Sequence, residues 1–331
     1  QYIGADKKDK IKISVHTSIC ISIILGLILS LLGIFASPSL LIMMKTPKVV
    51  LKSSILYLQI YCGGLIFNVI YNMATGILNA AGNSKKPLVY LAIASFTNII
   101  LDLLFIKIFK LGVMGAAIAT DISQAISCIL AIGYLLKVKS DYKLYIKDLK
   151  INKETAVKII KIGLPTAIQN MVISFSNVLV QSSVNAYGAT AMAGYAAYLK
   201  IDGFNILPVL SISMAVTTFT GQNVGANRLD RVKKGMYSSL IMVLVYTVFI
   251  GAVLLIFSHQ VLGLFTHSAQ VIMYGQLAMK YFCPYYFLLG ILNVFAGTVR
   301  GAGKGIPPMI ILLFSMCIFR ILWIKIALPF Y

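Results

Sequence analysis

The sequence predicts an all-α integral membrane protein, built from two homologous six-helix bundles that form a parallel repeat around a central cleft. Three observations lead to this prediction: a very apolar composition, basic residues that alternate between loops, and two stretches that repeat 221 positions apart. About nine spans of a twelve-helix parent are expected in the 331 residues.

The composition predicts a protein that crosses the membrane many times. Hydrophobic residues make up 59% of the chain, charged residues 11%, and the mean hydropathy is +0.91. A soluble protein carries about 25% charged residues. One span needs about 20 apolar residues. Pro38 is expected to end the first span, and Gly112 to open the fourth. The expected spans are 13–36, 53–80, 88–106, 112–136, 163–186, 189–220, 235–257, 272–298 and 306–328.

The lysines and arginines indicate which loops face the cytoplasm. Of 29 such residues, 20 lie in loops on one side and only 5 in the opposite loops. By the positive-inside rule, the basic side is cytoplasmic. This placement accounts for the net charge of +20 without nucleic acid. Membrane lipid, and not nucleic acid, is therefore the expected partner. The loops predicted to be cytoplasmic are 6–12, 83–86, 137–161, 227–234 and 299–305.

The repeat predicts a duplicated bundle. Residues 1–15 share Gln, Gly, Ala, Asp and Lys with residues 222–236, and the same spacing aligns 76–87 with 297–308 without a gap. A unit of this length is too long for a solenoid repeat, and in membrane proteins it is typical of transporters with two halves. The chain is therefore expected to lack the first two helices and the last helix of its parent. Six is an even number, so both copies should have the same orientation.

The predicted organisation has three parts: an N-lobe over 1–138, a cytoplasmic linker over 139–162 and a C-lobe over 163–331. The linker is the longest polar stretch. Its end, residues 151–162, has apolar residues at helical spacing and could lie in the membrane interface. A solvated linker with no other role is the alternative.

Three of the nine acidic residues fall inside expected spans: Asp102, Asp121 and Asp202. Each costs about 2.5–3.5 kcal/mol at mid-membrane, so each needs a partner or a wet cavity. Asn98 precedes Asp102 by one helical turn, on the same face. A carboxylate and an amide oxygen together could bind a proton or Na⁺. The alternative is that Asp102 reaches the outer surface or pairs with Lys107.

The other charged residues in the spans have simpler interpretations. Asp121 is expected to pair or to pack within the bundle, and Asp202 to form an internal ion pair with Lys200; a place in the substrate cleft is the alternative for these residues. Lys280 and Arg320 need counter-charges or a water-filled cavity, and could also face an anionic group of a substrate.

Motifs for an enzyme are not found in the sequence. The segment GAGKG at 301–305 lacks the first glycine and the final Ser or Thr of a phosphate-binding loop. There is no HExxH, GxSxG or paired carboxylate. We therefore expect no catalytic residue and no cofactor.

Four motifs carry a family resemblance: the repeated QxxGA, the GxxxAxG turn followed by a basic residue and Pro, NIILDLLFI at 98–106, and LGVMGAAIATDISQ at 111–124. Together they resemble multidrug and toxin extrusion (MATE) transporters over essentially the whole chain. In that family, entry of Na⁺ or H⁺ drives export of bulky, often cationic compounds through a cleft between two lobes. The resemblance implies a cation-coupling cluster in which Asn98, Asp102 and Thr120 match by motif. Tyr57 matches by spacing only, with Tyr61 as a rival, and the acidic residue of the family's first helix lies outside this chain.

The predicted function is cation-coupled antiport of drugs or similar organic compounds by alternating access. The coupling ion is Na⁺ or H⁺, the location is the plasma membrane, and a monomer is expected. Coupling in the N-lobe is favoured, since 163–186 and 272–298 lack the acidic ligands that some branches of the family carry there. A flippase for a lipid-linked saccharide is the alternative, and a membrane-embedded transferase is a more distant one.

Overall fold

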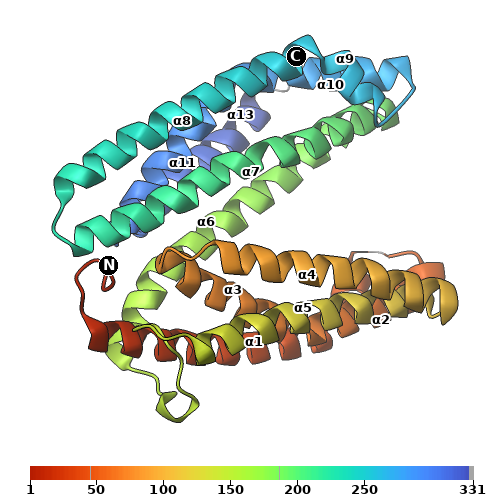
Figure 1. The fold of residues 1–331 in the computed structure, drawn as a ribbon. Helices are drawn as coiled ribbons and strands as arrows, with labels where there is room; N and C mark the ends of the chain where they lie inside the picture. The colour runs from red at the N-terminus through yellow and green to blue at the C-terminus, as the bar shows by residue number, and fades with distance from the viewer. Residues whose placement is uncertain (45, 186, 328–331) are drawn as a thin grey trace. The chain divides into compact units, whose positions relative to one another are not determined.

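The computed structural model describes residues 1–44, 46–185 and 187–327, and these residues form helices joined by short loops (Figure 1). Among the described residues, eight helical segments are long and apolar enough to cross a membrane. The ninth expected span, 306–328, is helical as far as residue 327, and its last residue lies outside the described part, as do the last four residues of the predicted C-lobe. The eight segments are Lys8–Met43, Lys48–Ala80, Lys85–Ile108, Gly112–Lys137, Lys153–Asn185, Ala189–Gly225, Leu229–Ile256 and Ala269–Gly301.

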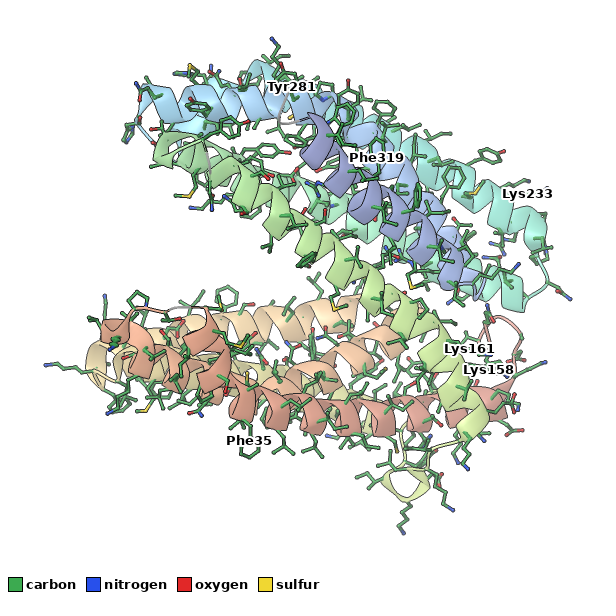
Figure 2. The ribbon with its side chains drawn as sticks, turned by 180° about the vertical axis from the view of Figure 1, so that it is seen from behind. Phe35, Lys158, Lys161, Lys233, Tyr281 and Phe319 are labelled. Carbon is green, nitrogen blue, oxygen red and sulfur yellow. The ribbon has the colours of Figure 1, made fainter. Side chains whose placement is uncertain are left out.

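Large apolar side chains cover the outside of these helices. Phe35 is 77% exposed and points away from the bundle, and Val49 is 93% exposed (Figure 2). A soluble monomer rarely exposes wide apolar patches of this kind. The surface therefore fits the hydrocarbon of a bilayer, as the composition predicts.

The chain divides into two compact units. One comprises Tyr2 and Asp6–Ile159, and the other comprises Gln1, Ile3–Ala5 and the described residues from Ile160 onward. In the first unit, α1 (Lys8–Met43) packs on α2 (Lys48–Gly63) and α3 (Leu65–Ala80), and α4 (Lys85–Asp102) packs on α5 (Gly112–Lys137).

In the second unit, α7 (Ala189–Gly225) is central and packs on α8 (Leu229–Ile256), α10 (Ala269–Phe282) and α11 (Tyr286–Gly301). The 37-residue length of α7 lets one helix contact all three. The remaining described elements are η1 (Leu103–Ile108), η2 (Ile146–Asp148), α6 (Lys153–Asn185), α9 (Ser258–Gly263), η3 (Cys283–Tyr285), α12 (Ile306–Leu313), η4 (Phe314–Phe319) and α13 (Arg320–Ala327).

The repeat in the sequence is also a repeat in the backbone. Helices begin at Lys8 and Leu229 and end at Ala80 and Gly301, in both cases 221 positions apart. The two turns carry left-handed residues at matched positions. Asp6 (φ 50°) corresponds to Asn227 (φ 57°), and Gly82 (φ 80°) corresponds to Gly303 (φ 89°). Gly, Asp and Asn adopt this conformation most readily, so the sequence repeat preserves the turns that aim the helices.

The two QxxGA loops meet each other inside the second unit. A Cβ on Gly4 would overlap the carbonyl oxygen of Gln222, and a Cβ on Gly225 would overlap that of Gln1. The Gln1 amide also donates to the carbonyl of Gly301, at 3.1 Å. The glycines of the motif are therefore required by a reciprocal close approach of backbone to backbone.

Pro38 does not end the first span, contrary to the sequence prediction, because α1 continues through it to Met43. A proline inside a helix leaves the carbonyl four residues earlier without its usual donor. That carbonyl belongs to Ile34, and the side-chain amide of Gln59 on α2 donates to it at 3.3 Å. A neighbouring helix thus supplies the hydrogen bond that Pro38 removes.

The predicted linker is held against α1. His16 Nε2 accepts from the backbone N–H of Tyr145 at 3.0 Å, and Thr17 Oγ1 accepts from that of Asn152 at 3.2 Å. Lys12 lies 2.7 Å from Asp148, and this contact lowers the pKa of the Asp148 carboxyl. Residues from Lys153 onward already belong to α6, since their apolar residues keep helical spacing, so the last part of the predicted linker is helix.

Candidate functional site

Asn98 and Asp102 form the centre of the candidate site, one turn apart on α4. Both side chains are half-buried. Within the described ranges, Asn98 Nδ2 and Asp102 Oδ1 are buried atoms without a hydrogen-bond partner. Leaving a buried polar atom unpaired costs about 1–3 kcal/mol, and more when it is charged. The unpaired carboxylate oxygen of Asp102 is an acceptor open to a cation, whereas the amide nitrogen of Asn98 is a donor and needs an acceptor.

The helix changes its winding directly after Asp102. Residues Leu103–Ile108 form the π-helical segment η1. Turns of this kind occur mainly at functional sites. A Cβ on Gly115 would lie 2.9 Å from Cβ of Phe105, so α5 packs closely on η1. A shift of η1 would therefore change its packing against α5.

Asp102 makes no ion pair with Lys107 in the part of the chain that the structure describes, and Lys107 is exposed on η1. The simpler alternative for Asp102, pairing with Lys107, is therefore not realised.

Thr120 and Tyr57 contribute less directly. Thr120 Oγ1 donates to the carbonyl of Ala116 on its own helix, at 2.9 Å, which leaves only its oxygen lone pairs for another group. Tyr57 stacks on Tyr61 with ring centroids 6.2 Å apart. Among the described residues, no hydrogen bond joins Thr120 or Tyr57 to Asn98 or Asp102. The structure brings the two rival tyrosines together and does not choose between them.

Asp121 lies against the break between α2 and α3. A Cβ on Gly64 would overlap the Asp121 carboxylate, and its Oδ1 has no well-formed hydrogen bond within the described ranges. The sequence predicted pairing or packing, and the structure gives packing against a helix break. The paired glycines Gly63 and Gly64 were the signal for this break.

The expected ion pair between Lys200 and Asp202 is not formed. The Asp202 carboxylate lies near the hydroxyls of Tyr198 and Tyr286. The Tyr286 hydroxyl also lies 3.4 Å from that of Tyr198. The Lys200 ammonium lies 5.8 Å from the centroid of the Phe265 ring. The Asp202 carboxylate and the Lys200 ammonium thus have separate surroundings: two tyrosine hydroxyls for the first and the Phe265 ring for the second. Residues two apart on a helix point in different directions, so the two charges do not meet.

Sequence reasoning missed both tyrosines. Tyr198 precedes Asp202 by one helical turn and could have been found by spacing. Tyr286 comes from another span and carries no local signal.

Arg320 and Lys280 have no acidic partner among the described residues. Arg320 Nη1 donates to Ser176 Oγ at 3.0 Å and to Asn177 Oδ1 at 3.2 Å, so neutral side chains of α6 satisfy part of its guanidinium. Lys280 is exposed near the end of α10. The counter-charges expected for these two residues are not part of their surroundings.

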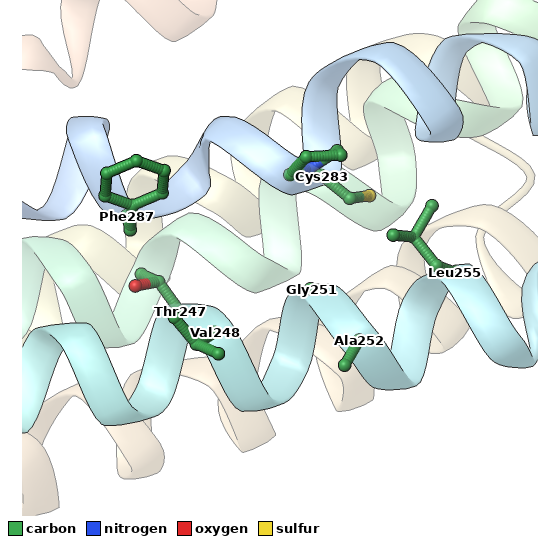
Figure 3. Close-up of a pocket in the computed structure, with 8 residues that line it drawn as sticks. Thr247, Val248, Gly251, Ala252, Leu255, Cys283 and Phe287 are labelled. Atoms are coloured by element: carbon green, nitrogen blue, oxygen red, sulfur yellow. The ribbon is translucent and has the colours of Figure 1, made fainter.

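A small cavity of about 170 Å³ lies between α8 and the start of α11 (Figure 3). Its polar lining group, the Thr247 hydroxyl, donates to the carbonyl of Val243 at 2.7 Å. None of the site residues predicted from the sequence lines this cavity. It therefore adds nothing to the candidate site.

The described residues include no group of three or more His, Cys, Asp or Glu side chains that could hold a metal ion. A site for a single small cation at Asn98 and Asp102 would thus depend on one carboxylate, one amide oxygen and further oxygen ligands such as backbone carbonyls or water.

Comparisons with known proteins agree on one family. The MatE family model matches residues 1–104 and 165–324. The probable multidrug resistance protein YoeA of Bacillus subtilis is 30% identical over 96% of this chain and 70% of its own length. The probable multidrug resistance protein YpnP of the same organism is 30% identical over 87% of this chain and 64% of its own length. The chain thus spans about two thirds of these relatives.

A solved structure has the same fold. An outward-facing multidrug resistance MATE family transporter superposes with a TM-score of 0.91 at 23% identity, covering 98% of this chain and 73% of that one.

Proposed function

This chain belongs to the MatE family, whose members are transporters and not enzymes, and we propose that it takes part in export of drugs or other bulky organic compounds, often cationic, by cation-coupled antiport. The observation that carries the coupling proposal is the unpaired buried carboxylate oxygen of Asp102, with the Asn98 side chain one turn away on the same helix. The names of YoeA and YpnP support the choice of drugs as substrates.

Binding of a cation would remove the cost of a buried, unpaired charge. The Asp102 carboxylate costs free energy as long as it is ionised without a partner. A proton neutralises it, and Na⁺ neutralises it while also recruiting the amide oxygen of Asn98. Binding thereby stabilises one arrangement of α4 and η1 over another.

The close packing of η1 on α5 offers a route by which such a change could spread. Gly115 and Phe105 fix the contact between the two elements. Thr120 and Asp121 are both on α5, so a shift of η1 would move them relative to Tyr57 and Gly64. In this proposal the N-lobe helices repack on cation binding, and substrate is released to the outside.

The flippase alternative depended on a basic cleft with Lys280 and Arg320. The Arg320 guanidinium is already hydrogen-bonded to Ser176 and Asn177, and Lys280 is exposed. These contacts give the flippase no particular support, so drug export is the function that we propose.

The test uses the complete protein in membrane vesicles, with ethidium as the substrate and an imposed Na⁺ or pH gradient as the driving force. We expect Asp102→Asn to abolish gradient-driven efflux. Asp121→Asn is the comparison, because it removes the other half-buried carboxylate of the same unit. If Asp102→Asn leaves efflux and its cation dependence intact, or only Asp121→Asn abolishes them, the assignment of the site is wrong.

Asn98→Ala separates the two candidate ions. Na⁺ needs the amide oxygen as a ligand, whereas a proton needs only the carboxylate. We therefore expect Asn98→Ala to weaken Na⁺-driven efflux strongly and H⁺-driven efflux little. An equal loss with both ions would show that Asn98 has a structural role.

A further inference from the structure

A second, larger groove lies between α7 and α8, with a volume of about 470 Å³. This volume is within the range of about 300–1,000 Å³ that is usual for small-molecule sites. Its polar lining comes from the first turns of α8: Arg231, Lys234, Ser238 and Ser239. We infer that this groove binds the phosphate headgroup of an anionic phospholipid.

The two basic groups of the groove are exposed and have no anion of the chain to pair with in the described residues. Arg231, Lys234 and Ser238 follow one another at helical spacing and so share one face of α8. After Asp202 the sequence contains a single acidic residue, Asp230. The Arg228 guanidinium forms an ion pair with that carboxylate: Nε and Nη2 donate to its two oxygens at 3.1 and 3.2 Å. Within the described ranges, Arg231 and Lys234 form no ion pair.

The opposite wall of the groove is apolar. It is formed by Ala215, Val216 and Phe219 of α7. A Cβ on Gly235 would overlap the Phe219 ring, so the absence of a side chain at this position lets the ring close the groove from below. Two basic groups and two hydroxyls thus face an apolar wall, which matches a molecule with a phosphate joined to acyl chains.

The position along the helix favours a lipid over a soluble anion. Arg231 and Lys234 belong to the predicted cytoplasmic loop 227–234, next to Lys233, which Figure 2 labels near the start of α8. Ser238 and Ser239 lie about one turn further toward the hydrocarbon. Basic pockets between membrane helices on this side are typical sites for anionic headgroups.

In the first copy of the repeat, the matched end of α1 is covered by the linker. Thr17, the counterpart of Ser238, is bonded to the linker: it donates to the carbonyl of Lys150 at 3.4 Å and accepts from Asn152. Lys12 and Lys8, whose counterparts Lys233 and Leu229 do not line the groove, lie 2.7 and 3.8 Å from Asp148 and Asp141 of the same linker. The counterparts of Arg231 and Lys234 are Lys10 and Ile13. In the first copy the chain supplies its own anions, whereas α8 has no such segment over it in the described residues.

The experiment measures binding of phosphatidylglycerol to the purified complete protein in detergent, by native mass spectrometry during a lipid titration. Each basic side chain near an anionic surface contributes about 1 kcal/mol, or about fivefold in affinity. We expect the variant Arg231→Gln/Lys234→Gln to bind the first phosphatidylglycerol about 30-fold more weakly. Phosphatidylcholine, with no net charge, should bind weakly to both proteins.

A matched pair of single variants controls for folding and for net charge. Lys234→Gln and Lys233→Gln remove the same charge from adjacent residues, but only Lys234 lines the groove. We expect a loss of about fivefold for the first and none for the second. Equal effects of the two variants, or no effect of the double variant, would overturn the proposal.

Two further measurements distinguish a lipid from free phosphate. Ala215→Phe fills the apolar side of the groove and should weaken phosphatidylglycerol binding. Inorganic phosphate at equal concentration should not displace the lipid. If phosphate displaces it, or Ala215→Phe leaves the lipid affinity unchanged, the groove is a soluble-anion site and the lipid proposal is wrong.

Discussion

The two copies of the repeat carry different side chains at the position of the candidate site. In the first copy, Asn98 and Asp102 present buried atoms without a partner. At the matched positions of the second copy, Phe319 and Trp323 stack with ring centroids 6.1 Å apart, and the two residues are 59% and 63% exposed. Duplication kept the helices and turns, but at these two matched positions the second copy has aromatic rings in place of an amide and a carboxylate. The chemistry of this protein is therefore less symmetric than its scaffold.

The helix irregularity beside each pair also differs. In the first copy the π-helical turn η1 follows Asp102, whereas in the second copy η4 precedes Trp323 and ends at Phe319. A wide turn after the carboxylate gives that side chain a backbone able to rearrange when its charge changes. In the second copy the charge next to the turn is that of Arg320, which is hydrogen-bonded to Ser176 and Asn177.

The strongest test of this asymmetry compares Asp102→Asn with Trp323→Phe. We expect ethidium efflux by the first variant to fall to the level of cells without the transporter, because the only proposed coupling group is neutralised. Trp323→Phe keeps an exposed aromatic ring and should retain cation-dependent efflux. Loss of cation dependence in Trp323→Phe would mean that the second copy also takes part in coupling.

A second test uses the contact at which the two copies are most alike. Gly4→Ala and Gly225→Ala each place a Cβ on a backbone carbonyl that cannot rotate away. Overpacking of this kind costs about 1–3 kcal/mol. We expect both variants to lower the melting temperature in detergent by similar amounts. A large effect of one and none of the other would show that the reciprocal contact is not equivalent on its two sides.

A third test uses two glycines that occupy matched positions in the repeat but have different surroundings. A Cβ on Gly297 would lie 2.7 Å from the carbonyl oxygen of Ser213, whereas one on Gly76 would meet nothing within 4 Å. Gly297→Ala should destabilise by about 1–3 kcal/mol, and Gly76→Ala should stabilise by up to about 1 kcal/mol. Thermal melting of the two variants would give equal shifts only if the two copies packed alike.

The repeat made much of the fold predictable from the sequence. The spacing of 221 fixes the turns at Asp6 and Asn227 and at Gly82 and Gly303, because these local conformations depend on a few residues each. Pro38 was misjudged because the donor to the Ile34 carbonyl, Gln59, lies on another helix. Local rules fail where a distant side chain supplies what the local sequence lacks.

The candidate site, like the fold, could be predicted only in part from the sequence. Asn98 and Asp102 are one turn apart and could be found by helical spacing alone. The proximity of Tyr286 to Asp202 could not, since that tyrosine comes from a different span. The open groove on α8 could not be predicted either, because its apolar wall belongs to α7 and no motif links the two.

The smallest expected effect concerns the linker that covers the first copy alone. The Lys12 ammonium holds the pKa of the Asp148 carboxyl below its usual range. A lowered folded-state pKa gives a contribution that is present above the ordinary carboxyl pKa of about 4 and is lost as the pH falls through the folded value.

We therefore expect backbone amides in 141–152 to exchange faster at pH 3 than at pH 7, after correction for the intrinsic pH dependence of exchange. Asp148→Asn should remove part of this difference, and the effect should be small because the pair is exposed. Asp230→Asn is the matched control in the second copy, where Arg228 is the partner. If Asp230→Asn alters exchange in 141–152 as much as Asp148→Asn does, the Lys12–Asp148 contact is not what holds the linker on α1.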